Sequence, residues 1–258
     1  MFNNAAAYDG YVGRWSRLVG EQFVAWLNVP AGQKWFDLGA GTGVLTSVIL
    51  QKAAPEKILG MDLSESYIQR ALQNVHDERV EFKVGDANTA ITDPPQFDVV
   101  VSGLVLNFVP SAQQTLETMK QLVKSGGTVG AYVWDYAGKM EMMRHFWDAA
   151  IVIDPTAASM DAGKQFAICD PDNLYAAFVE LGLHQVEVRP IDVQTVFKDF
   201  DDYWRPFLAA QGSISKYLTS LDDQTKEAIT IQLRKQLPIN SDGSIHLTAR
   251  AWAAKGIK

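Results

Sequence analysis

The chain has 258 residues, of which 47% are hydrophobic, and it carries 23 Lys and Arg against 30 Asp and Glu. This content excludes a disordered chain, and the length fits one large domain or a domain with a cap, since domains usually have about 100–200 residues. The net charge of −7 argues against a nucleic-acid partner, which would need a basic surface.

Signals for export or membrane insertion are not visible in the sequence. No apolar run reaches the roughly 18 residues of a membrane helix, and residues 1–10 do not have the pattern of a signal peptide. Cys169 is the single cysteine, which excludes internal disulfides and a cysteine-based zinc site. We therefore expect a cytoplasmic protein, a monomer or a homodimer, whose partner is a small molecule rather than a nucleic acid or a membrane.

The hydrophobic pattern predicts a helix at 14–28, followed by strands that alternate with helices. The predicted strands are 34–38, 57–62, 80–84, 97–102 and 128–134, and the helices between them are 44–52, 64–75 and 112–123. Strands that alternate with helices indicate βαβ units and a parallel sheet.

After residue 134 the pattern changes. Helices are predicted at 139–153, 172–181, 201–210 and 219–235, and strands at 186–196 and 244–253. We therefore divide a single domain into a core of about 30–134, 182–197 and 242–256, a helical cap of about 135–181 and 198–240, and an N-terminal arm, 1–29.

The strongest signal is the run Asp37-Leu38-Gly39-Ala40-Gly41-Thr42-Gly43, which follows a predicted strand and precedes a helix. Glycines allow a tight turn and close approach of a ligand, and the helix N-terminus offers free N–H groups, although a plain tight turn is the alternative. Asp62 ends the second strand, where a carboxylate can bind both ribose hydroxyls, and Asp86 ends the third. Three acidic residues at strand ends suit an adenosine that carries a positive charge better than a pyrophosphate.

These residues carry a resemblance to a known family. The runs WFDLGAGTGVLT, LGMD, GDA and FDVVVSG resemble, in order and spacing, the motifs of class I S-adenosylmethionine-dependent methyltransferases over about 33–134. The rest of the chain resembles bacterial methyltransferases of the broad type 11 group, many of which have no assigned substrate. Ala40 departs from the cysteine of many relatives. The resemblance implies a Rossmann-like, seven-stranded, mostly parallel sheet with helices on both faces, and a helical cap from insertions after strand 5 and between strands 6 and 7.

The resemblance also implies the cofactor, S-adenosyl-L-methionine, with S-adenosyl-L-homocysteine as product, and the residues that contact it. The methionine part would meet Asp37, Gly39, Ala40, Gly41, Ser102, Gly103 and Leu104. The ribose would meet Asp62, and the adenine would meet Leu63, Asp86 and Ala87. The N-terminal arm, with Tyr8, Tyr11, Arg14 and Trp15, would fold over the site, and Arg14 would pair with the methionine carboxylate.

The expected reaction is methyl transfer to a small-molecule acceptor by in-line displacement, which depends mostly on alignment and needs no universal base. If the nucleophile is an oxygen that must lose a proton, the candidates for that role are His145, Asp135 and Tyr136. Aromatic residues of the predicted cap suggest an apolar acceptor pocket. The predicted acceptor-binding residues are Trp134, Arg144, Trp147, Trp204 and Asn107. We expect no metal, because the four histidines are scattered.

Two other function classes stay open. A dinucleotide-dependent oxidoreductase shares the sheet, the glycine turn and Asp62, but its third glycine would stand at residue 44 rather than at Gly43. A protein that binds S-adenosylmethionine as a sensor or partner subunit, without turnover, would keep every cofactor motif. Two further features are interpreted as structural: Asp93-Pro94-Pro95 as a turn, because it precedes its strand, and Cys169 as a packed thiol.

Overall fold

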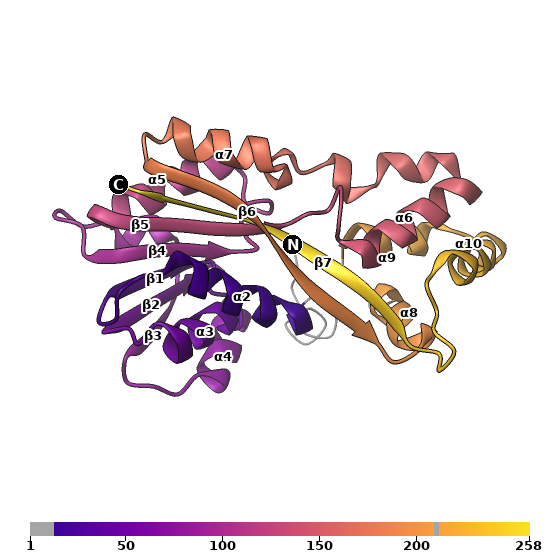
Figure 1. Cartoon of the computed structure of the whole chain (residues 1–258), viewed down its shortest axis with the longest axis horizontal. Helices are drawn as coiled ribbons and strands as arrows, with labels where there is room; N and C mark the ends of the chain where they lie inside the picture. The colour runs from indigo at the N-terminus through magenta and orange to yellow at the C-terminus, as the bar shows by residue number, and fades with distance from the viewer. Residues whose placement is uncertain (1–12, 209–211) are drawn as a thin grey trace. The chain divides into compact units, whose positions relative to one another are not determined.

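The computed structural model describes residues 13–208 and 212–258, which form two compact units (Figure 1). We name the first the sheet unit and the second the helical unit. The sheet unit comprises Ser16–Val133, Ile168–Ile191 and Ala251–Lys258, and the helical unit comprises the described part of Met1–Trp15 together with Trp134–Ala167 and Asp192–Arg250.

One seven-stranded sheet has the strand order β3-β2-β1-β4-β5-β7-β6. Its strands are β1 (Lys34–Leu38), β2 (Lys57–Asp62), β3 (Val80–Val84), β4 (Phe97–Gly103), β5 (Val123–Trp134), β6 (His184–Phe197) and β7 (Ile245–Ile257). The pairs β1·β2, β2·β3, β1·β4 and β4·β5 are parallel. The predicted Rossmann-like, mostly parallel sheet is confirmed.

Helices cover both faces of this sheet. The sheet unit contains α2 (Arg14–Leu27, from Ser16 onward), α3 (Val44–Lys52), α4 (Glu65–Asn74), α5 (Ala112–Leu122) and α7 (Pro171–Glu180), with the short 3-10 helices η2 (Ala87–Ala90) and η5 (Ala167–Cys169). The crossovers through α3 and α4 step along the sheet in one direction and the crossover through α5 steps in the other. Because such crossovers are right-handed, α3 and α4 lie on one face and α5 on the other.

Local sequence explains where these helices begin. Ser64 caps α4 by accepting a hydrogen bond from the Tyr67 N–H, and Ser111 caps α5 through the Gln114 N–H. Asp170 caps α7, accepting from the N–H groups of Asp172 and Asn173. Such caps satisfy N–H groups that have no partner inside the helix, so they fix where the chain turns into the helix.

The strand pattern also follows from burial. The apolar run of β4 has Val99, Val100 and Val101 at 1% exposure or less, as expected for a central parallel strand covered on both faces. The outer strand β3 has no fully buried residue. The residues at the carboxyl ends of β1 and β4 therefore stand on strands that are mostly buried.

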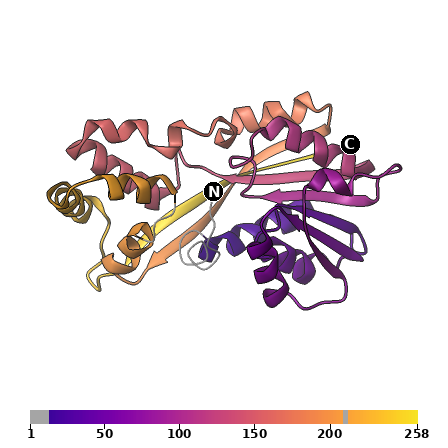
Figure 2. The same ribbon diagram turned by 180° about the vertical axis from the view of Figure 1, so that it is seen from behind.

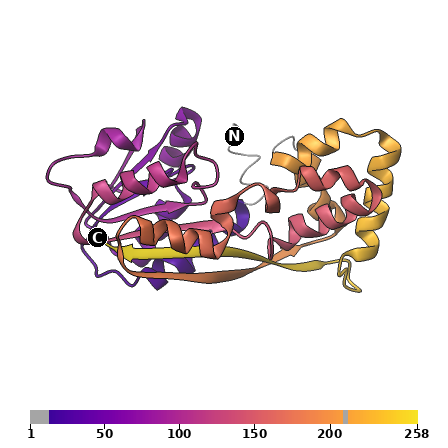
Figure 3. The ribbon, with the colours of Figure 1, turned by 90° about the horizontal axis from the view of Figure 1, so that it is seen from above.

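The helical unit contains α6 (Glu141–Ile153), α8 (Phe200–Leu208), α9 (Gly212–Ser220) and α10 (Asp223–Gln236), with the short 3-10 helices η3 (Pro155–Ser159) and η4 (Ala162–Lys164). Figures 2 and 3 show these helices from two further directions. Their core is aromatic: Phe146 lies within 6.3 Å, ring centre to ring centre, of Trp147, Trp204, Phe207 and Tyr217. None of the helices in the described part of the chain is long and apolar enough to cross a membrane.

Three features differ from the sequence prediction. The helix predicted at 219–235 begins only at Asp223, because Asp222 caps α10 by accepting from the Thr225 N–H, and α9 occupies a segment for which no helix was predicted. The fifth strand begins at Val123 rather than at residue 128. The structure groups α7, which was predicted in the cap, with the sheet unit, where it contacts α5.

Candidate functional site

The glycine loop between β1 and α3 is tied to the neighbouring strand. The N–H groups of Gly39 and Ala40 both donate to the Met61 carbonyl, at 2.8 and 3.0 Å. Gly39 has a φ of +73°, and a Cβ there would lie 2.5 Å from Val105 Cγ2, so only glycine fits. Gly41 has a φ of +53°. A Cβ added there would have free space around it, because the nearest atom would be the Gly39 carbonyl oxygen at 3.9 Å. This side of the loop has room for a ligand.

Asp62, at the end of β2, is held by two backbone donors. Its Oδ2 accepts from the Gly41 N–H at 3.0 Å and its Oδ1 accepts from the Ser64 N–H at 2.8 Å. Burial raises the pKa of this carboxyl, and the two backbone hydrogen bonds oppose that rise. An ionised carboxylate has about four acceptor positions, so each oxygen keeps capacity for one more donor. Two fixed acceptors side by side match the two hydroxyls of a ribose.

Asp37, at the end of β1, is a buried carboxyl with one free oxygen. Its Oδ2 accepts from the Thr46 Oγ1 hydroxyl at 2.6 Å, and its Oδ1 has no hydrogen-bond partner among the described residues. Desolvation by burial, with a smaller contribution from the nearby Asp62 charge, raises the pKa of Asp37 to about 7. A buried acceptor of this kind suits a positively charged ligand group.

The other predicted cofactor contacts lie at the same edge of the sheet. Leu63 is 70% exposed, directly after Asp62, although it is a large apolar side chain. Asp86 follows β3 and accepts from the N–H and the Nδ2 of Asn88, which fixes the turn before Ala87. Ser102 ends β4, where its hydroxyl donates to the Leu38 carbonyl at 2.9 Å. Because the carboxyl ends of parallel strands share one edge, these groups lie along the same edge of the sheet.

Sequence reasoning missed two of the residues that shape this site. Thr46, which binds Asp37, lies inside α3 and belongs to no ligand-binding pattern. Ser64, whose N–H binds Asp62, was predicted only as the first residue of a helix. The Asp-x-Ser spacing is the local signal that could have revealed it, because a carboxylate often accepts from the N–H two residues ahead.

The N-terminal arm is only partly described, and Arg14 has protein partners. Tyr8 and Tyr11 lie outside the described residues. The Arg14 guanidinium donates to the Asp202 carboxylate at 3.0 Å and to the Val196 carbonyl at 3.3 Å. It also stacks over the rings of Trp15 and Phe197, 4.5 and 4.9 Å from their centres. These contacts occupy the group that was predicted to bind the methionine carboxylate, and they do not favour that role.

Two of the three predicted proton acceptors are engaged in the loop after β5. Both carboxylate oxygens of Asp135 accept backbone hydrogen bonds, from Gly138 at 2.8 Å and Lys139 at 3.0 Å. The carbonyl of Tyr136 accepts from Arg144, and its ring lies 5.4 Å from that of Phe166. Both residues therefore shape this loop.

His145 lies on α6, and burial lowers its pKa despite the opposing charges of Glu141 and Asp148. Its ring is therefore mostly neutral at pH 7, the form in which an imidazole accepts a proton.

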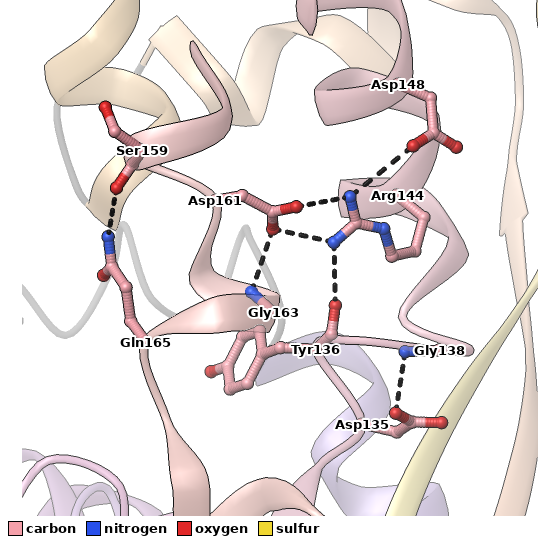
Figure 4. A network of polar contacts seen from close by, with 9 residues as sticks. All are labelled: Asp135, Tyr136, Gly138, Arg144, Asp148, Ser159, Asp161, Gly163 and Gln165. Carbon is pink, nitrogen blue, oxygen red and sulfur yellow. Dashed lines mark hydrogen bonds and ion pairs between the residues drawn. The ribbon is translucent and has the colours of Figure 1, made fainter. Parts of the chain in front are cut away.

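Arg144 is the centre of a polar network (Figure 4). Its Nη1 and Nη2 donate to the two oxygens of Asp161 at 2.7 and 2.8 Å, and Nη1 also donates to the Tyr136 carbonyl at 3.2 Å. Asp161 in turn accepts from the Gly163 N–H at 2.9 Å. The predicted role of Arg144 in binding an acceptor carboxylate is not favoured, because its guanidinium already holds a buried carboxylate.

The remaining acceptor candidates are divided between the units. Trp134, Trp147 and Trp204 belong to the helical unit and Asn107 to the sheet unit. The indole N–H groups of Trp134 and Trp147 are buried without a hydrogen-bond partner among the described residues, and so is the Asn107 Nδ2. Trp204 stacks on Phe200, with ring centres 6.1 Å apart. Within the described part of the chain no group of His, Cys, Asp and Glu side chains is arranged to hold a metal ion.

Comparisons with known proteins agree with this geometry. Residues 36–129 match the sequence profile of a family described as "Methyltransferase domain". The arsenite methyltransferase of Halobacterium salinarum is 26% identical over 201 residues, which are 76% of this chain and 47% of that protein. The ubiquinone biosynthesis O-methyltransferase of an Azoarcus species is 34% identical over 102 residues, 38% of this chain and 43% of that protein. The chain thus spans less than half the length of these curated relatives.

A solved structure shows the same fold over nearly the whole chain. Phosphoethanolamine N-methyltransferase 2 of Haemonchus contortus, in complex with phosphomonomethylethanolamine and S-adenosylhomocysteine, is 16% identical with a TM-score of 0.58. The match covers 98% of this chain and 57% of that one. Residues 36–129, which contain the glycine loop and the acidic residues at the strand ends, thus match a methyltransferase domain.

Proposed function

We propose that the protein transfers the methyl group of S-adenosylmethionine to a small-molecule acceptor. The observation that carries this proposal is the carboxylate of Asp62, which two backbone N–H groups hold at the end of β2 beside the open side of Gly41. A carboxylate fixed in this way provides paired acceptors for the hydroxyls of a ribose. The second carboxyl, Asp37 before the glycine loop, disfavours a pyrophosphate there, so the pair favours an adenosine with a positively charged group over a dinucleotide.

The adenosine half of the ligand would lie along the ends of β2 and β3. Asp62 would accept hydrogen bonds from both ribose hydroxyls. Leu63 would pack on the adenine ring, which explains an apolar side chain that is 70% exposed, and Asp86 and Ala87 would meet the adenine edge. Burying Leu63 under a base would remove apolar surface from water, so this contact stabilises the complex.

The methionine half would lie along the ends of β1 and β4. The free Oδ1 of Asp37 would accept from the ammonium group, with the backbone of Gly39, Ala40 and Gly41 below it and the backbone of Ser102, Gly103 and Leu104 beside it. Asp37 would then be ionised in the complex, because a positive charge nearby lowers the pKa of a carboxyl.

The bound cofactor supplies an electrophilic methyl carbon on a sulfonium. The protein's task is to align the acceptor atom opposite the sulfur and to exclude water, and orientation of this kind is worth about 7–11 kcal/mol. The side chains of Trp134, Trp147 and Trp204 are proposed to line the acceptor site, and His145, neutral at pH 7, is the preferred group to take a proton from an acceptor that carries one. Asp135 and Tyr136 remain weaker candidates, because both already shape their loop.

The curated relatives support a small acceptor, since their names include arsenite, ubiquinone-biosynthesis and demethylmenaquinone methyltransferases. The test is formation of S-adenosylhomocysteine from S-adenosylmethionine with a panel of small phenols, amines, thiols and carboxylates. We expect turnover with at least one compound, lost in Asp62→Ala and kept in the control Asp172→Ala, an exposed residue of α7. Cofactor binding without turnover on any compound would instead favour a sensor, and an Asp62→Ala variant as active as the wild type would overturn the assignment.

A further inference from the structure

A buried amide donor lacks a partner beside the glycine loop. The Nδ2 of Asn107 is hidden from solvent and makes no hydrogen bond with any residue that the structure describes. Buried polar groups in folded proteins are almost always paired, and an unpaired donor costs stability. Because an amide NH₂ group only donates, the missing partner must be an acceptor such as an oxygen atom.

The backbone around Asn107 is fixed. Leu104 has a φ of +62°, and its N–H donates to the Tyr132 carbonyl at 2.8 Å, which anchors the chain as it leaves β4. The Phe108 N–H then donates to the Val105 carbonyl at 2.8 Å and closes a turn that contains Asn107. Val105 packs directly on Gly39, where a Cβ would meet its Cγ2 at 2.5 Å. Asn107 is therefore held in a rigid turn that rests on the glycine loop.

The distribution of charge around the site indicates which oxygen of the ligand would accept a hydrogen bond from Asn107. Asp37, Asp62 and Asp86 follow β1, β2 and β3, so a negatively charged ligand group is repelled from that side of the site. In the strand order β3-β2-β1-β4, the end of β4 lies on the other side of β1 from Asp62 and Asp86. A carboxylate of the ligand is therefore best placed at the turn after β4, where Asn107 offers a neutral donor.

We infer that Asn107 is a cofactor-positioning residue whose Nδ2 donates a hydrogen bond to the carboxylate of the methionine part. The inference rests on the proposed function, and it assigns to Asn107 the role that was predicted for Arg14, whose guanidinium is bound to Asp202. Asp37 on β1 and Asn107 in the turn after the neighbouring strand β4 then recognise the two charged ends of one amino-acid group. The protein would thereby distinguish S-adenosylhomocysteine from a nucleoside that lacks this group.

The test compares two ligands by calorimetric titration: S-adenosylhomocysteine, and methylthioadenosine, which keeps the adenosine and thioether but has no amino-acid group. The variants are Asn107→Leu, which removes the donor, and Asn107→Asp, which replaces it with a negative charge. Asn240→Asp, in the exposed turn before β7, is the matched control for the added charge. Melting temperatures check that each variant folds, and Asn107→Ala, which also removes the donor, replaces Asn107→Leu if that variant does not fold.

Asn107→Leu should weaken S-adenosylhomocysteine binding by about tenfold to a hundredfold, as for the loss of a hydrogen bond to a charged group, and Asn107→Asp by at least as much. Methylthioadenosine affinity should change less than about twofold, since it lacks the carboxylate. Equal losses for both ligands, or no loss in either variant, would overturn the role of Asn107 and leave the proposed function intact. Failure of the wild type to bind S-adenosylhomocysteine would overturn both.

Discussion

At the scale of single residues, the proposed site contains polar groups with unfilled hydrogen-bonding capacity. Among the described residues, Asp62 has acceptor capacity that its two backbone donors do not fill, and neither Asp37 Oδ1 nor Asn107 Nδ2 has a hydrogen-bond partner. Each unmet group lowers the stability of the free protein, and each becomes paired when a ligand of matching polarity binds. We therefore expect ligand binding at these groups to stabilise the protein.

Asp37 gives a prediction for stability against pH. Its pKa of about 7 in the folded protein lies above the 3.8 of the unfolded chain, so the folded state holds more protons between these values. Stability should therefore fall as pH rises from about 4 to 7 and then level off, with a contribution of up to about 4 kcal/mol from this group. Asparagine has nearly the same shape as aspartate and does not ionise, so Asp37→Asn should lack this pH dependence.

The measurement is urea unfolding of the wild type and Asp37→Asn between pH 5 and 8. We expect the free energy of unfolding of Asp37→Asn to rise relative to that of the wild type as pH increases. A difference that does not change over this range would show that Asp37 is ionised throughout. Asp172→Asn, at an exposed position on α7, controls for the general effect of removing a carboxylate.

At the scale of elements, the Arg144–Asp161 pair fixes η4 and the loop after β5 to helix α6. The side chains are 15% and 5% exposed, and the guanidinium binds the carboxylate through two nitrogens. Removing one partner of a buried pair leaves an unpaired buried charge and costs about 3–5 kcal/mol. We therefore expect Arg144→Met to lower the free energy of unfolding by about this amount, and Arg144→Met with Asp161→Leu to lower it less than the sum of the single changes.

The control for this prediction is a pair of equal length on the surface. Arg79 Nη2 and Asp77 Oδ2 are also 2.7 Å apart, but these side chains are 40% and 26% exposed. Exposed pairs contribute about 0–1 kcal/mol, so Arg79→Met should cost little. Urea unfolding of all four variants measures both effects, and equal losses for Arg144→Met and Arg79→Met would show that burial does not govern the Arg144 pair.

At the scale of the whole molecule, ligand binding should protect a defined part of the chain. Hydrogen exchange with saturating S-adenosylhomocysteine is expected to slow at 37–43, 62–64, 86–90 and 102–108, the segments at the carboxyl ends of the first four strands. Binding that excludes the unfolded state should also add about 2.7 kcal/mol of stability at a ligand concentration 100 times the Kd. Protection confined to the helical unit, with none at these segments, would contradict the proposed site.

The helices and strands that the sequence predicted correctly are those determined by the local order of apolar and turn residues. The strands Lys34–Leu38 and Lys57–Asp62 and the helix Val44–Lys52 occur at the predicted bounds, because each has its own apolar period and turn residues. The partner of Arg14 could not be predicted, since Asp202 lies 188 residues away and no pattern links them. The break at Asp222 was missed because a capping residue followed by an amphipathic run resembles the middle of a longer helix.

The central claim is that the edge formed by β1 to β4 binds an adenosine with a charged methionine part, and calorimetric titration tests it most directly. The purified chain would be titrated with S-adenosylhomocysteine and, in parallel, with NADH. We expect the chain to bind S-adenosylhomocysteine with micromolar affinity and not to bind NADH. In Asp62→Ala the affinity for S-adenosylhomocysteine should fall roughly tenfold to a hundredfold. Binding of NADH alone, or of neither ligand, would contradict it.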